Sequence, residues 1–314
     1  MTTKTWYSGI DNYRKHTLTF GQESNTFTLE LLDVESRNVN TIHDAFEMHL
    51  SGANLPIEVF YSGGADSECI IKVCLDRNIP VKAMTLRLLM GGAPINVRDL
   101  YYAEKFCREH NVQHTIVDLN IDKFYNNGDH IQYMDSYKFN RFPTATLLWL
   151  LEQCSSFPVI GGDYAWPQNN IERKVYSPHR HDHMCFDQYM RDKGITGIGN
   201  MISHSIDSNL MFINEHLKTH SDDPFYKHNL FNNLGLPLEK RFRSFGWETI
   251  FQETADTHRM TVDLWATHQN LIDRNKVTRN VIKWNKKFAE IIGGVPGEND
   301  SHGVATIRYQ GIEL

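Results

Sequence analysis

A serine–glycine–glycine turn is the part of the sequence best suited to chemistry. The run Ile57–Tyr61 is rich in β-formers, and Ser62, Gly63 and Gly64 follow it directly, before a helical pattern. Glycine has no Cβ, so backbone N–H groups can approach a phosphate closely. The start of the following helix adds unpaired N–H donors and a partial positive charge. The segment is therefore typical of an anion cradle.

Two polar side chains in the first turn of that helix extend the cradle. Ser67, like Ser62, offers a hydroxyl donor to phosphate oxygens. A carboxylate repels phosphate, so the natural role of Asp66 is to hold Mg²⁺. An isolated Ser-Gly-Gly turn is more often a plain strand-to-helix connection with capping residues. Here the strand before it, the helix after it and the Asp-Ser pair together favour phosphate binding.

The pattern around these residues predicts a scaffold that can position them. Apolar runs of strand length alternate with helical patterns, which is typical of a doubly wound parallel sheet and predicts the α/β class. The expected strands are Ile57–Tyr61, Val81–Leu89, Val112–Leu119 and one beginning at Pro158–Ile160. The expected helices are Thr41–Leu50, a segment ending near Leu75, Arg98–His110 and Ala145–Cys154.

The remaining chain divides into less regular parts. Residues 1–50 are expected to be an N-terminal extension with strand-like runs, and residues 51–165 the nucleotide-binding core. Residues 166–314 are expected to be a mostly helical substrate or lid region, because helical signals return from Trp247 to Ile292. They include Val277–Ile292, whose basic residues could touch RNA or form a solvated face: Lys276, Arg279, Lys283, Lys286 and Lys287.

Composition limits the classes of protein. The chain has 314 residues, and its 32 basic and 38 acidic side chains give a net charge of −6, which argues against a protein that mainly coats nucleic acid. A hydrophobic content of 40% excludes disorder. The first residues, MTTKTWYSGI, lack a signal-peptide core, and no apolar run approaches the ~20 residues of a membrane helix. Five cysteines without a CxxC pair indicate reduced thiols, so we expect a cytoplasmic protein that does not bind membranes.

The segment Ser62–Ser67 resembles the PP-loop (SGGxDS) of the ATP pyrophosphatases. These enzymes cleave ATP between its α and β phosphates and activate a substrate as an adenylate. Within that superfamily, residues 41–165 are most similar to the synthetase domain of asparagine synthetases and their β-lactam-forming relatives. That domain has a helix before the strand and a spacing that is reproduced here by Asp99, Tyr102, Ala103 and His114. The resemblance implies an adenine nucleotide alpha hydrolase-like fold.

The resemblance also implies a set of ligand contacts. Four residues should grip the pyrophosphate, namely Ser62, Gly63, Gly64 and Ser67, while Asp66 should bind its Mg²⁺. The adenine should contact mainly backbone groups near the end of the second strand, at Thr85, Leu86 and Arg87. The family's second acidic loop corresponds to Gly161, Gly162 and Asp163, where Asp163 is either a second Mg²⁺ ligand or a loop cap.

Two further clusters of polar residues have open roles. Lys240, Arg241 and Arg243 could stabilise the negative charge of the adenylation step, or they could be a solvated basic stretch. The histidines between His179 and Cys185 have metal-like spacing, but no second ligand pair stands out, so a structural or exposed role is favoured over zinc. A substrate contact by one of them is open.

The predicted activity is that of an ATP-dependent, AMP-forming ligase with ATP and Mg²⁺ as cofactors. A substrate carboxylate or amide oxygen attacks the α-phosphorus, pyrophosphate leaves, and a nitrogen nucleophile displaces AMP. Only about sixty residues precede the loop and the first cysteine is Cys69, so we do not expect this chain to draw ammonia from glutamine as the glutaminase domain of asparagine synthetases does. The nitrogen must come from free ammonia, from a separate ammonia-supplying partner or from the small-molecule acceptor itself.

Three alternatives remain open. A sulfonucleotide reductase would need a C-terminal cysteine, whereas the last cysteine is Cys185. A nucleic-acid-modifying PP-loop enzyme would need paired cysteines or a strong basic face. A non-catalytic nucleotide-binding protein is supported by the shortened second acidic loop. The sequence does not identify the acceptor, the nitrogen donor, the oligomeric state or the role of residues 166–235.

Overall fold

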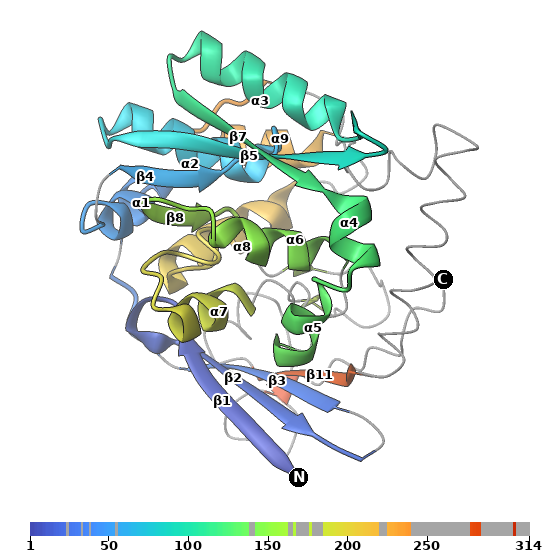
Figure 1. Ribbon diagram of the computed structural model, residues 1–314. Helices are drawn as coiled ribbons and strands as arrows, with labels where there is room; N and C mark the ends of the chain where they lie inside the picture. The colour runs from blue at the N-terminus through green and yellow to red at the C-terminus, as the bar shows by residue number, and fades with distance from the viewer. Residues whose placement is uncertain are drawn as a thin grey trace.

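A computed structural model gives the fold of most of the chain. It describes residues 1–22, 25–32, 34–37, 39–53, 56–137, 142–162, 166–167, 176–177, 185–219, 225–239, 277–283 and 304–305. Among these residues no helix has the length and apolar character needed to cross a bilayer. Two larger sheets and a two-stranded pair, β9 (Trp166–Pro167) with β10 (Tyr176–Ser177), make up the β-structure of the described part (Figure 1).

The central sheet is parallel and has the strand order of a doubly wound fold. Its main strands are β4 (Ile57–Phe60), β5 (Val81–Met90), β7 (Gln113–Asn120) and β8 (Phe157–Ile160). They lie in the order β7-β5-β4-β8, and the short β6 (Ala93–Pro94) pairs antiparallel with the end of β5. The chain therefore builds the sheet outward from β4 in both directions. The α/β doubly wound class predicted from the sequence is confirmed.

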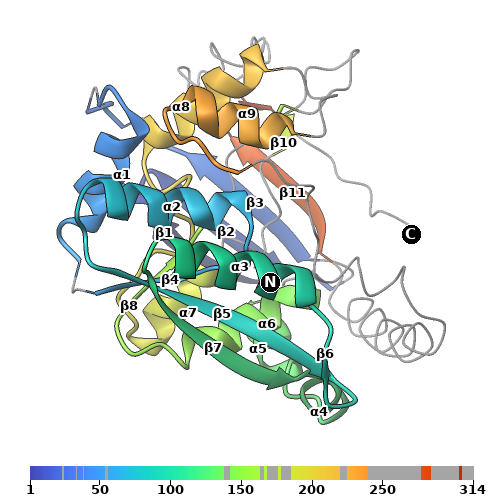
Figure 2. The same cartoon turned by 90° about the horizontal axis from the view of Figure 1, so that it is seen from above.

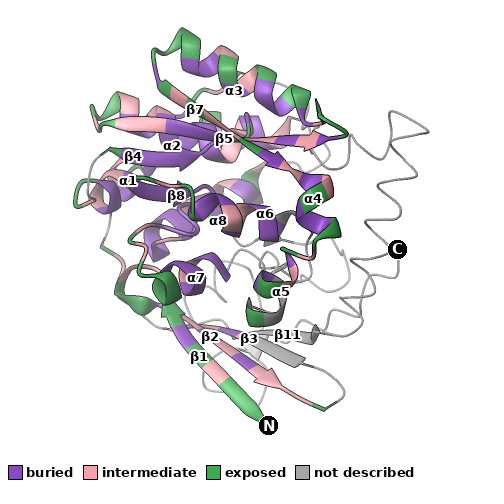
Figure 3. Ribbon diagram, viewed as in Figure 1, coloured by how far each residue is buried: buried purple, intermediate pink, exposed green. Residues whose placement is uncertain are grey.

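Helices cover both faces of this sheet because its strands are apolar on both sides. On one face, Ile57 and Val59 pack with α1 (Ile42–Leu50), α2 (Ala65–Asp76) and α3 (Val97–Glu109). On the other face, Phe60 and Ile160 pack with four helices. These are α4 (Ile121–Asn126), α5 (Ile131–Tyr137), α6 (Phe142–Leu151) and α7 (Cys185–Lys193) (Figure 2). Figure 3 shows that β4 and the inner sides of the flanking helices are buried.

Two more helices complete the first layer. They are α8 (Ile206–Lys218) and α9 (Tyr226–Asn233), and Phe212, Leu230 and Phe231 join them to the core that contains α1 and α2. Between α7 and α8, Ile198 continues the sheet beyond β8. Its N–H donates to the Pro158 carbonyl at 2.9 Å, and its own carbonyl accepts from the Ile160 N–H at 2.9 Å.

The second sheet combines N-terminal strands with two strands from the C-terminal part of the chain. Its antiparallel strands β1 (Thr2–Ser8), β2 (Arg14–Phe20) and β3 (Asn25–Leu31) come from the N-terminus, with a short 3-10 helix, η1 (Ile10–Asn12), between the first two. Strand β11 (Val277–Lys283) pairs parallel with β3, and β12 (Val304–Ala305) pairs with β11. Figure 1 shows this sheet at one end of the molecule, beyond α5 and α7.

The prediction of a helix from Val277 onward is wrong over the described part of that segment. Residues 277–283 form a strand. Four of these seven residues are β-branched, a composition that favours strands, and β3 supplies an edge for pairing. The basic helical face therefore does not exist over Arg279 and Lys283, while Lys276, Lys286 and Lys287 lie outside the described residues.

Candidate functional site

The candidate site lies where the loop after β4 meets the loop after β8. These neighbouring strands connect to helices on opposite sides, and such a switch point is where open α/β sheets bind ligands. The two loops are in contact, since a Cβ on Gly161 would lie 3.2 Å from the Ser67 nitrogen and 3.2 Å from the Asp66 carbonyl carbon. The structure thus brings together the two segments that the sequence placed at the phosphates.

Gly63 gives the first loop its shape. Its φ is +71°, a left-handed conformation that favours glycine. A Cβ there would lie 2.7 Å from the Asp99 carbonyl oxygen and 3.0 Å from the Tyr102 Cβ. The first turns of α3 therefore pack directly against the loop. This contact gives a structural reason for the Asp99, Tyr102 and Ala103 spacing.

The N-terminus of α2 is available to an anion. Gly64 caps the helix in an extended conformation and has no side chain to bond the first N–H groups. Ser62 is exposed beside it. Ser67 is buried, and its hydroxyl donates to the Gly64 carbonyl at 3.3 Å. In this arrangement the Ser62 side of the turn faces solvent, whereas Ser67 supports the turn from inside.

Asp66 forms an ion pair with a lysine that the sequence analysis did not identify. The Nζ of Lys227, on α9, lies 2.5 Å from Asp66 Oδ2. The Lys227 side chain is 11% exposed and the Asp66 side chain 29%. Nothing in the local sequence marks Lys227, because it lies in a stretch without clear periodicity and 161 residues from its partner. The cations predicted to stabilise the charge of the adenylation step, Lys240, Arg241 and Arg243, lie outside the described residues.

A buried hydrogen-bond network supports the loop from behind. The Thr85 hydroxyl donates its proton to the Tyr61 carbonyl at 2.5 Å, so its oxygen can only accept from His114 Nε2, at 2.7 Å. His114 therefore carries a proton on Nε2. Burial lowers the pKa of His114. The Tyr61 hydroxyl donates to the buried Glu68 carboxylate, which fixes the residue that precedes Ser62.

The predicted adenine segment lies within β5, which runs on to Met90. Arg87 makes a bidentate ion pair with Asp118 on β7, with nitrogen–oxygen distances of 2.6 and 2.7 Å. The Leu86 carbonyl accepts from the Asn96 side-chain amide at 2.8 Å, and the Leu88 N–H donates to the same side chain at 2.9 Å. Asn96 thus takes the place of a neighbouring strand beyond the end of β4. Contact of Thr85, Leu86 and Arg87 with adenine stays a prediction.

The second loop is held by the segment that precedes α8. Gly162 has a φ of +71°, and a Cβ there would lie 2.0 Å from Asn200 Oδ1. The Met201 N–H donates to the Ile160 carbonyl at 2.9 Å, and the Ile202 N–H donates to the Gly161 carbonyl at 3.1 Å. Asp163 and the histidines of residues 179–183 lie outside the described residues.

The groups at this site suit a Mg²⁺ ion that is also bound by the phosphates of a nucleotide. Among the described residues, no cluster of three or more His, Cys, Asp or Glu side chains could hold a metal by itself. Mg²⁺, however, usually needs only one or two carboxylates together with the substrate phosphates. Asp66 supplies one carboxylate in the first turn of α2, at a helix N-terminus that the N-cap residue Gly64 does not cap with a side chain.

The cysteines are not arranged for thiol chemistry. All five are free and form no disulfide, and four of them are buried. Burial raises the pKa of Cys74, Cys107 and Cys154 to about 12, so these thiols are protonated at neutral pH. Cys69 lies behind the loop and donates to the Asp66 carbonyl at 2.9 Å.

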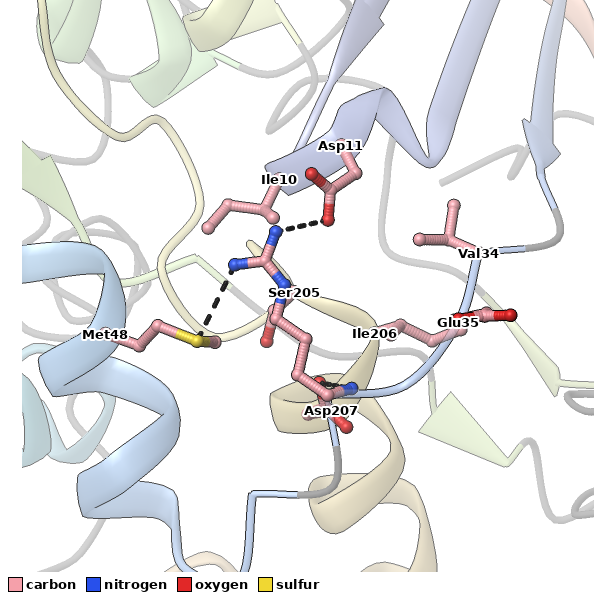
Figure 4. A pocket seen from close by; sticks show the side chains of 9 residues that line it. Ile10, Asp11, Val34, Glu35, Met48, Ser205, Ile206 and Asp207 are labelled. Atoms are coloured by element: carbon pink, nitrogen blue, oxygen red, sulfur yellow. Dashed lines mark hydrogen bonds and ion pairs between the residues drawn. The ribbon is translucent and has the colours of Figure 1, made fainter.

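A separate small pocket lies between η1, the segment 34–37, α1 and the start of α8. It has a volume of about 10 Å³, far below that of a nucleotide site. Figure 4 shows Asp11 at one side of this pocket, where its carboxylate accepts from the Arg37 guanidinium at 2.5 Å. Asp207 accepts from the Arg37 N–H at 3.1 Å. These polar contacts connect elements of the fold, and the pocket is too small to hold a nucleotide.

Comparison with known proteins identifies no family. No protein-family model matches the chain, and no curated protein matches its sequence. Among solved structures, U34-tRNA thiolase NcsA from Methanococcus maripaludis is 16% identical over 75% of this chain and 80% of its own, with a TM-score of 0.29. The NH3-dependent NAD synthetase from Campylobacter jejuni is 10% identical over 74% and 93%, with a TM-score of 0.30. The NMN synthetase from Francisella tularensis is 12% identical over 70% and 90%, with a TM-score of 0.27. TM-scores this low carry no argument about activity.

Proposed function

We propose that this protein is an ATP-dependent, AMP-forming ligase of the PP-loop type. The observation that carries the proposal is the arrangement at the switch point. An open helix N-terminus, the exposed Ser62, the carboxylate of Asp66 and the cation of Lys227 converge on one place. N–H donors and a cation suit phosphate oxygens, while a carboxylate suits the metal that accompanies them. MgATP is the ligand that needs all of these groups.

Each group has a role in pyrophosphate release. The N–H groups at the start of α2 and the Ser62 hydroxyl bind the β and γ phosphates, and Asp66 holds Mg²⁺, which when bound neutralises and orients them. Lys227 stabilises the charge that develops on the leaving pyrophosphate. We retain Lys240, Arg241 and Arg243 as further candidates for this role, and Asp163 as a second metal ligand. Catalysis then consists mainly of positioning and of charge stabilisation.

The proposed reaction forms a C–N bond, as in asparagine synthetases. A carboxylate or amide oxygen of a small acceptor attacks the α-phosphorus, and pyrophosphate leaves. A nitrogen nucleophile, free or delivered by a partner protein, then displaces AMP. The protonated, buried cysteines favour this chemistry over that of a sulfonucleotide reductase, which requires a reactive thiol.

The test is the release of AMP and pyrophosphate from MgATP by the purified protein, with and without ammonia and a panel of amino acids. We expect equal amounts of both products, dependent on one added compound and absent in Asp66→Ala. Formation of ADP and phosphate would overturn the proposal. ATP binding without turnover across the panel would instead favour a macromolecular substrate or a protein that only binds the nucleotide.

A further inference from the structure

Lys227 and Asp66 form an ion pair, whereas the proposed reaction requires these two charged groups to be separated. In the reaction, Asp66 holds Mg²⁺ and Lys227 contacts phosphate. In the structure they form an ion pair with each other at 2.5 Å. We propose that Lys227 is a placeholder cation: it occupies the Mg²⁺ position at Asp66 until MgATP arrives and then transfers to the phosphates. This inference rests on the proposed function.

The burial of Lys227 supports an exchange of partners. The Lys227 side chain is only 11% exposed, and an ammonium this far from water is costly without an anion beside it. The same holds, less strongly, for the Asp66 carboxylate. When both groups exchange partners together, Lys227 gains a phosphate as Asp66 gains the metal. Neither charge is then left uncompensated in either state.

The positions of the two helices allow this exchange without a change of fold. Asp66 lies in the first turn of α2, beside the N–H groups that would bind the phosphates. Lys227 lies in the first turn of α9, whose Leu230 and Phe231 are anchored in the same core as α2. A lysine side chain has a flexible four-carbon stem, so its ammonium can move from the carboxylate to a neighbouring phosphate while α9 stays in place.

The placeholder role has a consequence for metal-free nucleotide. ATP without Mg²⁺ must separate Lys227 from Asp66, and its phosphates then face the negative charge of Asp66. Asp66 should therefore oppose metal-free ATP and favour MgATP. An ion pair that merely joined α9 to α2 would have no such selectivity, and removal of either partner would weaken both complexes alike.

Isothermal titration calorimetry with ATP, performed once in Mg²⁺ and once in EDTA, distinguishes a placeholder cation from an ion pair that only joins α9 to α2. In the unmodified protein we expect Mg²⁺ to raise the affinity for ATP by at least about tenfold. Asp66→Asn should bind metal-free ATP about tenfold more tightly than the unmodified protein does and should lose the gain from Mg²⁺. Lys227→Met should bind metal-free ATP about tenfold more weakly. The two substitutions thus act in opposite directions.

A matched pair at the other end of α2 provides the control. Lys72 and Asp76 form an ion pair at 3.8 Å, and Lys72→Met and Asp76→Asn make the same chemical changes away from the loop. Both controls should leave ATP binding unchanged. Weaker metal-free binding by Asp66→Asn would overturn the placeholder role, even if Lys227→Met failed to fold. Absence of MgATP binding by the unmodified protein would instead overturn the proposed function.

Discussion

At the scale of single residues, Gly63 is a position in the loop after β4 where both the backbone conformation and the packing exclude a side chain. Its positive φ and its contact with the Asp99 carbonyl act together, because a side chain would be strained and would also overlap backbone that cannot move aside. The sequence marks the glycine, but it does not reveal that α3 is the neighbour that excludes a side chain.

We expect Gly63→Ala to lower the free energy of unfolding by at least about 2 kcal/mol and to abolish ATP binding. Gly92→Ala is the matched control, since Gly92 has a φ of +83° and a Cβ there would meet no neighbouring atom within 4 Å. That variant should lose only about 1 kcal/mol and should bind ATP normally. Urea unfolding and ATP titration of both variants measure the difference; equal losses would contradict the contact with α3.

Buried histidines make the stability depend on pH. Burial, together with the nearby Arg37, lowers the pKa of His49 to about 4, and burial lowers the pKa of His216 to about 4. Both stay neutral in the folded protein, whereas in the unfolded chain they gain protons below about pH 6.5. The unfolded state therefore binds more protons, so the stability is full above pH 6.5 and falls as the pH decreases toward 4.

As the pH falls from 7 to 5, each of these two histidines should lower the free energy of unfolding by about 2 kcal/mol. His49→Phe keeps an aromatic ring against His204, whose ring centroid lies 5.2 Å away, and it removes one titrating group. Urea unfolding across this pH range should show a shallower decline for the variant. A decline as steep as that of the unmodified protein would show that His49 does not contribute.

At the scale of secondary-structure elements, β5 extends beyond its neighbour β4. Strand β4 ends at Phe60, opposite Met84, while β5 runs to Met90. The backbone groups of Leu86 and Leu88 that would otherwise face an empty edge are bonded by the buried Asn96 side chain. One residue thus completes the sheet next to the predicted adenine segment.

Asn96→Ala should therefore lower the free energy of unfolding by about 2–3 kcal/mol, because it leaves the half-buried Leu86 carbonyl and the buried Leu88 N–H without their partner. It should also speed hydrogen exchange at the Leu88 amide. Asn233→Ala removes an exposed hydrogen bond to Glu215 of 2.8 Å and should cost less than about 1 kcal/mol. If both variants had the same stability, the edge role of Asn96 would be refuted.

At the scale of the whole molecule, the N-terminal sheet is connected to the candidate site through the segment before α8. Arg14 on β2 pairs with Asp187 at 3.2 Å and donates to the Ser203 hydroxyl at 3.0 Å. Asp187 also accepts from the Gly199 N–H at 3.0 Å. The same segment, residues 199–203, holds the loop after β8. The N-terminal strands thus support the second loop of the site.

Removing the Arg14 guanidinium leaves the Asp187 carboxylate, whose side chain is 11% exposed, without its cation, so Arg14→Met should cost about 3–5 kcal/mol of unfolding free energy. Lys15→Met is the control at the adjacent residue: its pair with Glu30, at 3.1 Å, is about one-third exposed and should contribute less than about 1 kcal/mol. Urea unfolding compares the two variants. A cost for Arg14→Met as small as that for Lys15→Met would show that the N-terminal sheet is not anchored there.

Features that depend on neighbours along the chain could be derived from the order of residues alone. Strand, glycine turn and helix at residues 57–76, and the alternation that yields a doubly wound sheet, follow from periodicity and turn chemistry over a few residues. A cation at the phosphates could be expected on chemical grounds. The predicted cations, Lys240, Arg241 and Arg243, lie outside the described residues, and the structure places Lys227 beside Asp66.

Contacts between segments that are distant in the sequence, by contrast, were revealed only by the tertiary structure. Lys227 reaches Asp66, and Gly161 reaches the first turn of α2, because apolar faces of α2, α9 and β8 pack into one core. Likewise, β11 became a strand because β3 offered it an edge, despite the helical spacing of its basic residues. Such contacts depend on the packing of whole faces, and local sequence patterns carry no information about which faces will pack together.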